Sequence, residues 1–247
     1  MSLTLNSQWY EEWFNSEYYH LLYDERNHKE AKFFIDNLIT YLKPPKNTQI
    51  LDLACGKGRH SIYLSNEYSV TGIDLSANSI QHACQFKSEK LSFFVHDMRK
   101  QFRVNHFDLV LNLFTSFGYF ELEKDNQDIV KCIAKSLKPD GIMIIDFMNS
   151  KKVIKNLVEE EFKTINKTEF HIQRWVKNKF IIKQIEVKEN GKSCFYQESV
   201  KVLTLKNFEK YFKSAGLEII DLFGDYQLNI FDEDQSGRLI LVAKKYL

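Results

Sequence analysis

The stretch that decides the fold is Ile50-Leu51-Asp52-Leu53-Ala54-Cys55-Gly56-Lys57-Gly58-Arg59-His60. A short apolar strand ends here in an acid and is followed by two glycines one position apart. A second apolar run, residues 70–73, ends in another acid, Asp74. Glycines let a backbone approach a ligand closely, and an acid after the second strand can accept hydrogen bonds from ribose hydroxyls. The pattern predicts the nucleoside-binding half of a doubly wound α/β domain.

Composition sets the limits of the remaining analysis. A chain of 247 residues is long enough for one substantial α/β domain, or for that domain with an insertion. Its 34 basic and 33 acidic residues nearly balance, so no global field recruits nucleic acid or an anionic membrane. The four cysteines form no CxxC pair, which argues against a metal site and a disulfide framework. We see no transmembrane-length apolar segment and no signal peptide, and therefore expect a soluble, cytoplasmic protein.

Periodicity along the chain predicts alternating strands and helices. Apolar spacings of three and four indicate an amphipathic helix over residues 7–23, which would break at Asn15-Ser16 if anywhere, and a second over 27–42. Strands are predicted at 49–53, 69–73, 91–96, 107–113 and 142–147, with helices at 59–66, 76–88 and 123–137. Pro139-Asp140-Gly141 is predicted as a turn. This alternation implies a parallel sheet with right-handed crossovers.

The sequence pattern changes after a short helix predicted at 150–158. Residues 162–204 read as three or four strands, and Asn190-Gly191 is a hairpin turn signal. The α/β pattern then resumes with a helix at 205–215 and strands at 217–223 and 238–244. We therefore divide the chain into an N-terminal helical cap (1–45), an α/β domain (46–160 and 204–247) and an antiparallel β-insertion (161–203). The insertion is either a substrate lid or a dimer interface.

The quoted stretch and Asp74 resemble motifs I and II of the class I S-adenosylmethionine (SAM) methyltransferases. The resemblance is strong over residues 48–149 and weaker over 205–245. It implies a Rossmann-like seven-stranded sheet in the order 3-2-1-4-5-7-6, with the last strand antiparallel, and SAM as cofactor. It covers neither the insertion nor the N-terminal helices.

The resemblance also implies the cofactor site. The residues it points to are Asp52, Ala54, Cys55, Gly56, Gly58, Asp74, Leu75, Asp97, Met98, Asn112 and Phe114. In the family, a carbonyl at Ala54 or Cys55 and the carboxylate of Asp52 meet the methionine ammonium. Asp74 then binds the ribose, and Asp97 accepts from the adenine amino group. The alternatives from the residues alone are an ordinary tight turn at the glycines and a helix cap at Asp74.

Other candidates come from the N-terminal helices, the fourth strand and the insertion. Tyr19 and Arg26 would cover SAM, with packing and a solvated arginine as the alternative. The candidates for the substrate pocket are Phe117, Tyr119, Arg174 and Trp175. Period two puts His171, Gln173 and Trp175 on one face of their strand and Arg174 on the other, so they cannot all face substrate.

The function implied is methyl transfer from SAM to a small-molecule acceptor. There is no Asp/Asn-Pro-Pro-Tyr motif and no cysteine directly after the fourth predicted strand, which argues against two nucleic-acid classes. An NAD(P)-dependent oxidoreductase would need a third glycine at position 61, where Ser61 stands. A SAM-binding partner subunit without catalysis shares the cofactor motif and stays open, as does a homodimer.

Overall fold

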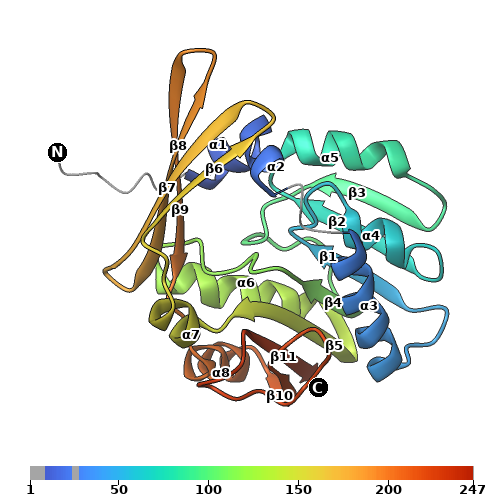
Figure 1. Cartoon of the computed structure of the whole chain (residues 1–247). Coiled ribbons are helices and arrows are strands. Elements are labelled where there is room, and N and C mark those ends of the chain that lie inside the picture. The colour runs from blue at the N-terminus through green and yellow to red at the C-terminus, as the bar shows by residue number, and fades with distance from the viewer. Residues whose placement is uncertain (1–8, 24–27, 247) are drawn as a thin grey trace.

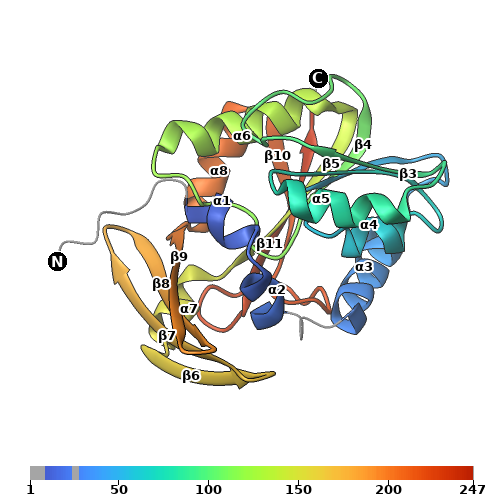
Figure 2. The ribbon, with the colours of Figure 1, turned by 90° about the horizontal axis from the view of Figure 1, so that it is seen from above.

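Two β-sheets organise the residues that the computed structural model describes, 9–23 and 28–246 (Figures 1 and 2). Sheet A has the strand order β10-β11-β5-β4-β1-β2-β3, and sheet B has the order β6-β7-β8-β9. The strands of sheet A are β1 (Gln49–Leu53), β2 (Ser69–Asp74), β3 (Leu91–Val95), β4 (Phe107–Asn112), β5 (Leu137–Met148), β10 (Leu217–Phe223) and β11 (Arg238–Lys245). Since β10 and β11 are the sixth and seventh strands of sheet A, the predicted order 3-2-1-4-5-7-6 is confirmed.

The central strands of sheet A end at one edge. β1 pairs in parallel with β2 on one side and with β4 on the other, and β11 runs antiparallel to β5 and β10. The strand order therefore reverses between β1 and β4. In open α/β sheets, ligands bind beyond the carboxyl ends of the strands at such a switch point.

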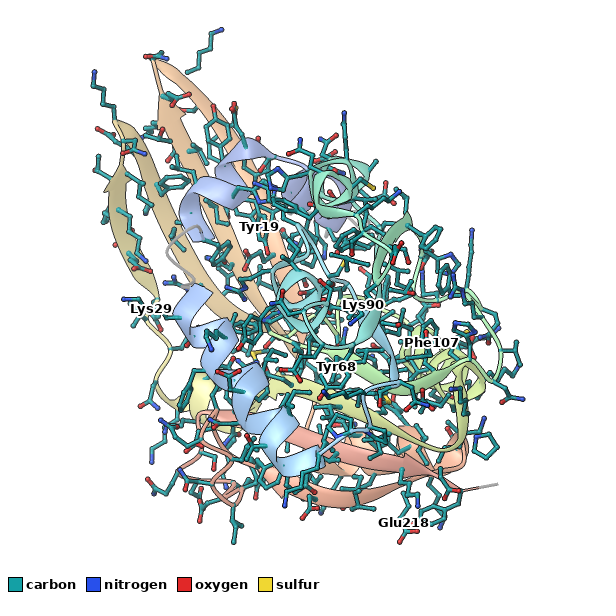
Figure 3. All side chains as sticks on the ribbon, turned by 90° about the vertical axis from the view of Figure 1, so that its right-hand side faces the viewer. Tyr19, Lys29, Tyr68, Lys90, Phe107 and Glu218 are labelled. Carbon is teal, nitrogen blue, oxygen red and sulfur yellow. The ribbon has the colours of Figure 1, made fainter. Side chains whose placement is uncertain are left out.

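Helices cover both faces of sheet A, and side chains fill the space between (Figures 2 and 3). One face carries α3 (His28–Leu42), α4 (Arg59–Leu64) and α5 (Ala77–Ala83), which is followed by the 3-10 helix η1 (Cys84–Phe86). The other carries α6 (Glu123–Ser136) and α8 (Leu205–Ser214). Because successive strand residues point to opposite faces, Ile50 packs with the first group and Leu51 with the second. The strands are thus buried on both faces, as in other parallel sheets.

The predicted β-insertion is sheet B. Its strands are β6 (Glu160–Ile165), β7 (Thr168–Lys177), β8 (Phe180–Glu189) and β9 (Lys192–Lys201), reached through α7 (Ser150–Lys155). The inner face buries Phe170, Ile172, Ile185 and Val187 in the hydrophobic cluster that also contains Leu51 of β1. The insertion is therefore part of the main core.

The single helix predicted at residues 7–23 is two helices, α1 (Trp9–Phe14) and α2 (Glu17–Tyr23). They meet at Asn15-Ser16, the predicted point of weakness. The Ser16 amide closes α1 by donating to the Trp13 carbonyl at 3.0 Å, and the Ser16 hydroxyl accepts from the Tyr19 amide at 3.1 Å. A serine that caps the following helix explains the break.

One local prediction is wrong. Pro139-Asp140-Gly141 lies inside β5, which begins at Leu137 rather than at 142. The ladder with β4 shifts register between Phe107 and Leu109, and Asp140 has φ 60°. The turn residues therefore form an irregularity in a longer strand, a device typical of β-bulges.

Candidate functional site

A cavity of about 790 Å³ is lined both by the loops at the carboxyl ends of sheet A and by sheet B. Helices α1 and α2 complete its roof. The aromatic side chains that line it are Trp9, Tyr10, Phe14, Tyr19, Tyr23, Phe86, Phe114, Tyr119 and Phe120. This volume falls in the range of about 300–1,000 Å³ found for small-molecule pockets.

The loop after β1 meets the cavity with its backbone. Ala54 and Gly56 have φ of 61° and 55°, and the Cys55 amide donates to the Ile73 carbonyl at 3.0 Å. A Cβ added at Gly56 would meet no protein atom within 4 Å, so this glycine faces open space. At Gly58 the expectation of close ligand approach is wrong, because an added Cβ would lie 2.7 Å from the Phe93 ring. The first glycine thus opens the cavity, and the second permits packing at φ 81°.

Asp74 lines the cavity at the end of β2 and ties β2 to the glycine loop. Its Oδ2 accepts from the Gly56 amide and its Oδ1 from the Ser76 amide, both at 2.8 Å. Burial raises the pKa of this carboxyl, and the backbone hydrogen bonds oppose that rise. Helix α5 is capped by Ser76, whose hydroxyl accepts from the Ser79 amide at 3.1 Å. The N-cap of α5 is therefore Ser76 and not Asp74, which was the alternative role for this acid.

Asp52 lies at the bottom of the cavity and is 2% exposed. The Ser61 hydroxyl donates to its Oδ2 at 2.5 Å. Burial raises the pKa of Asp52 to about 6, against the lowering effect of the Ser61 hydrogen bond, and the charge of Asp74 adds to the rise. A buried carboxyl in this state is stabilised as an anion by any cation that binds beside it.

Asp97 and Met98 line the cavity after β3, and Leu75 lines it after β2. Side-chain nitrogens of Arg99 donate to Asp97 at 2.7, 3.0 and 3.1 Å. Burial opposes ionisation of Asp97, but these hydrogen bonds outweigh it and lower its pKa. The Arg99 guanidinium lies 4.6 Å above the Phe120 ring. Sequence reasoning found Asp97 and missed the arginine that fixes it.

The loop after β4 has an uncommon backbone, with φ of 58° at Phe114 and 61° at Thr115. Such conformations persist only where the surroundings impose them. Here the fully buried Asp146 of β5 does so, because its Oδ2 accepts from the Phe114 amide and its carbonyl from the Thr115 amide, each at 2.9 Å. Arg238 of β11 donates to Asp146 Oδ1 at 2.7 Å and to the Thr115 hydroxyl at 2.9 Å. The sequence analysis missed both residues, because only the sheet topology brings them to the loop.

Three side chains surround the Phe114 ring. The Arg59 guanidinium lies 4.5 Å from its centroid, and the rings of His60 and Tyr226 lie 5.1 and 5.4 Å away. His60 Nε2 is buried, with no hydrogen-bond partner among the described residues. Burial lowers the pKa of His60 to about 3, so its imidazole is neutral. The Phe114 ring is thereby fixed at the floor of the cavity.

Two predicted site residues lie in the core instead. Asn112 is fully buried, and its amide nitrogen donates to the carbonyls of Leu53 at 3.0 Å and Ser116 at 3.2 Å. It braces the loop from below. Phe117 is also fully buried, with its ring 5.5 Å from that of Phe208 on α8. As a substrate-pocket residue, Phe117 is therefore a wrong prediction.

The structure resolves which face of the insertion points inward. Arg174 lines the cavity, whereas Trp175 does not and shares the outer face with His171 and Gln173. Tyr119 lines the cavity as expected, and its hydroxyl donates to the Thr115 carbonyl at 2.6 Å. Arg174 and Tyr119 stay candidates, and Trp175 is excluded.

Tyr19 lines the cavity from α2. Its ring lies 5.0 Å from that of Phe14 on α1. Arg26 lies outside the described residues. Within the described ranges, no group of His, Cys, Asp or Glu could hold a metal ion, and no helix there is long and apolar enough to cross a membrane.

In comparison with known proteins, residues 50–141 match the model of the methyltransferase domain. This match, the methyltransferase relatives and the similar solved structures support a class I SAM-dependent methyltransferase. A putative methyltransferase YqeM from Bacillus subtilis (strain 168) is 34% identical over 122 residues, 48% of this chain and 49% of that protein. This alignment therefore spans about half of the relative's length.

Two further comparisons cover more of the chain. The dTDP-3-amino-3,4,6-trideoxy-alpha-D-glucopyranose N,N-dimethyltransferase of Streptomyces venezuelae is 25% identical over 194 residues, 74% of this chain and 80% of that enzyme. The crystal structure of a SAM-dependent methyltransferase from Clostridium acetobutylicum ATCC 824 covers 93% of this chain and 96% of its own, with a TM-score of 0.79 and 19% identity. The latter shows that the two proteins share a fold over most of their length.

The residues at the strand ends fit SAM, the family's cofactor. Gly56 leaves open space where a side chain would stand, and the backbone of the loop faces that space. The carboxyls of Asp52, which is buried, and Asp74, which is half-buried, place negative charge beside it, and this suits a ligand that carries an ammonium and a sulfonium.

Proposed function

We propose that the chain transfers the methyl group of SAM to an amine of a small molecule held beneath sheet B. The observation that carries this proposal is a cavity with two unlike walls. One wall is the cofactor loop system of the methyltransferase family, and the other is an aromatic and polar roof. The amino-sugar N,N-dimethyltransferase among the relatives supports nitrogen as the methyl acceptor.

We propose cofactor contacts residue by residue. The carbonyls of Ala54 and Cys55 and the carboxylate of Asp52 would hold the methionine ammonium. Asp74 would accept from the ribose hydroxyls, although it already accepts from two backbone amides. A carboxylate has about four lone-pair sites, so both sets of bonds can coexist.

The adenine and the reacting end of SAM meet other side chains. Leu75 and Met98 would pack on the adenine, with Asp97 at its amino group. Phe114 would lie beneath the sulfonium, held by the floor described above, and Tyr19 would cover the cofactor from the roof. All five residues line the cavity.

The chemistry asks little of the protein beyond alignment. SAM supplies a methyl carbon activated by its positive sulfur. The chain must place a neutral amine in line with that carbon and keep water out. The roof would exclude water once the acceptor is bound, and Tyr119 with Arg174 would orient the acceptor. A neutral amine needs no dedicated base, so none has to be assigned.

The charge balance of the chain supports a small acceptor over a nucleic acid, since 34 basic and 33 acidic residues provide no basic surface excess. A cytoplasmic location and a homodimer are further proposals. Sedimentation of the purified chain tests the second.

Mass spectrometry tests the function directly. The purified chain is incubated with SAM and a panel of amino sugars and amino acids, and demethylated SAM and methylated amine are quantified. We expect one molecule of demethylated SAM for each methyl group that the amine gains. SAM binding by calorimetry without turnover of any amine would instead favour a non-catalytic SAM-binding subunit. Binding of NAD(P) in place of SAM would favour an oxidoreductase.

A further inference from the structure

Charged side chains that line the cavity differ between its two halves. The cofactor half has the carboxylates Asp52, Asp74 and Asp97, accompanied by Lys57 and Arg59. The half formed by sheet B and β11 has the cations Arg174, Lys183 and Arg238 and one carboxylate, Glu198. Glu11 also lines the cavity, from the exposed side of α1. Arg238 already forms an ion pair with the fully buried Asp146, so Arg174 and Lys183 are the two cations that the sheet B wall contributes.

Three of these charges form one row across sheet B. Arg174 on β7 pairs in register with Lys183 on β8, which pairs with Glu198 on β9. Directly opposite residues on neighbouring strands point to the same face of a sheet. Their side chains are 19%, 12% and 18% exposed. The row is thus held largely out of water, where charge interactions are strong.

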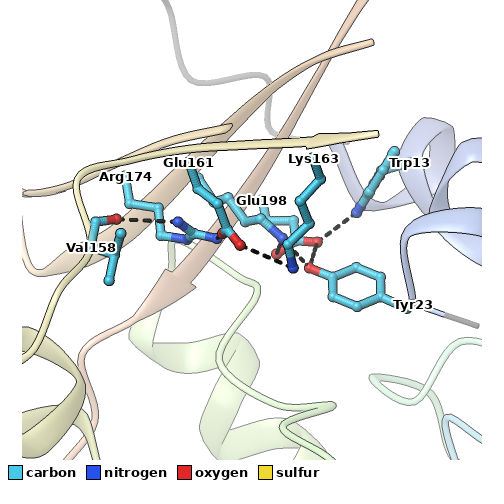
Figure 4. A network of polar contacts seen from close by, with 8 residues as sticks. Trp13, Tyr23, Val158, Glu161, Lys163, Arg174 and Glu198 are labelled. Carbon is cyan, nitrogen blue, oxygen red and sulfur yellow. Dashed lines mark hydrogen bonds and ion pairs between the residues drawn. The ribbon is translucent and has the colours of Figure 1, made fainter. Parts of the chain in front are cut away.

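Glu198 accepts hydrogen bonds from the N-terminal helices α1 and α2. Its Oε1 accepts from Trp13 Nε1 at 2.7 Å and from the Tyr23 hydroxyl at 2.6 Å (Figure 4). Lys183 donates to the same Tyr23 hydroxyl, and its Nζ lies 3.7 Å from Glu198 Oε2. That separation is beyond hydrogen-bond length, so the attraction between Lys183 and Glu198 is Coulombic.

Arg174 is oriented by the neighbouring strand β6 and by the segment before it. Its Nη1 donates to the Val158 carbonyl at 3.2 Å and its Nη2 to Glu161 on β6 (Figure 4). Glu161 also pairs with Lys163 at 3.0 Å and does not line the cavity. Arg174 is thus steered by groups outside the cavity and lines the cavity next to Lys183.

We propose that Arg174 and Lys183 bind an acidic group of the methyl acceptor, a carboxylate or a phosphoryl group. The acceptor would then be an amine that also carries an acid. Glu161 and Glu198 offset part of the charge of these two cations, and a bound anion would further reduce the repulsion between them. The sulfonium of SAM adds a further positive charge to the same cavity, which strengthens the attraction. Anchoring at the acid fixes the direction in which the amine points. This inference rests on the proposed function.

Calorimetry on protein saturated with S-adenosylhomocysteine (SAH), the demethylated cofactor, tests the inference without turnover. The phosphoryl arm compares glucosamine 6-phosphate with glucosamine, and the carboxylate arm compares β-alanine with β-alaninamide. We expect the acidic member of one pair to bind about tenfold tighter or more, the scale of a hydrogen bond to a charged group. The arm that shows this preference identifies the acid.

Variants assign the preference to the row. Lys183→Met should reduce the preference to less than about twofold with SAH affinity unchanged, and Lys183→Arg should retain it. Lys188→Met is the matched control, because Lys188 lies on the same strand and is exposed. An odd number of residues separates it from Lys183, so its side chain points to the outer face of sheet B. Arg174→Gln provides a second test of the site.

The outcomes separate the two proposals. Equal affinity within both pairs, or equal weakening of both members by Lys183→Met, overturns the acid-binding row. Turnover of neutral amines in preference to acidic ones overturns it too and leaves methyl transfer to an amine in place. Acid binding that depends on Lys183, without methylation of any amine, supports the row and overturns the proposed function.

Discussion

The two walls of the cavity are built in different ways. The cofactor wall comes from loops that directly follow the strands of sheet A, and most of its residues lie between positions 52 and 120. The roof joins α1 and α2 to sheet B, so that Trp13 contacts Glu198 at a sequence separation of 185 residues. The first wall is local in sequence, and the second exists only in the fold.

This difference assigns separate roles to the walls. The proposed cofactor wall lies mostly within residues 50–141, the range that matches the methyltransferase domain. The roof lies outside that range, where the acceptor would bind. We therefore expect substitutions in the first wall to change cofactor affinity and substitutions in the roof to change acceptor affinity.

Gly56→Val should have the largest effect. Valine strongly disfavours φ 55°, and its side chain would enter the open space beside the loop. We expect SAH affinity, measured by calorimetry, to fall by more than about a hundredfold, nearly 3 kcal/mol. Gly191→Val is the control, because Gly191 also has positive φ (75°) and open space but lies in the β8–β9 hairpin. Equal SAH affinity of the two variants would contradict the cofactor wall.

Asp74→Asn should weaken SAH by about 1–3 kcal/mol, the cost of losing hydrogen bonds to a charged acceptor. The probe that isolates the ribose is an SAH analogue without ribose hydroxyls. Wild type and variant should bind that analogue alike. If the variant weakens the analogue as much as SAH, Asp74 acts through its bond to the Gly56 amide instead.

A smaller effect should come from pH. The pKa of Asp52 is about 6 in the folded protein, compared with an ordinary value of 3.8. Ionisation of this buried group therefore destabilises the ligand-free fold. Its contribution is favourable at low pH and is lost as pH rises from about 4 to 6. A bound ammonium favours the anion, so SAH affinity should rise up to about tenfold from pH 5 to 7. Calorimetry across this range should give a flatter profile for Asp52→Asn, and an unchanged slope would contradict the assignment.

Tyr23→Phe should have the smallest effect and should act on the roof alone. It removes the hydroxyl between Lys183 and Glu198, so we expect the free energy of unfolding in urea to fall by about 0.5–1.5 kcal/mol. Acceptor KM should change while SAH affinity stays constant. Tyr18→Phe is the control, since Tyr18 bonds Glu189 at 3.2 Å outside the cavity. A loss of SAH affinity in Tyr23→Phe would contradict the assignment of separate roles to the two walls.

Sequence alone predicted the sheet because its signals are local. Apolar runs that end in Asp52 and Asp74, with glycines between, require only neighbouring residues to be read. The β-insertion was also found, because alternation and the Asn190-Gly191 turn are short-range patterns. Its inward face could not be chosen, since period two gives two faces and only packing distinguishes them.

The site was predicted less completely, for the same reason. Asp146 and Arg238 hold the Phe114 backbone from β5 and β11, and no spacing rule connects positions so far apart. Phe117 was misplaced because an aromatic beside a pocket motif and an aromatic in the core have the same one-dimensional pattern. His60 belongs to the quoted stretch, but the sequence does not show that its imidazole is buried beside Phe114.

The contact between Trp13 and Glu198 has a consequence for biosynthesis. Helix α1 leaves the ribosome early, whereas its partner strand β9 is translated only after β1 to β8 and the loops of the cofactor wall. The aromatic residues of α1 and α2 therefore have no strand β9 to pack against until most of the chain has been translated. Contacts of such long sequence separation form slowly. A nascent chain arrested before residue 192 would be able to assemble cofactor loops, but its cavity would lack the strand that carries Glu198.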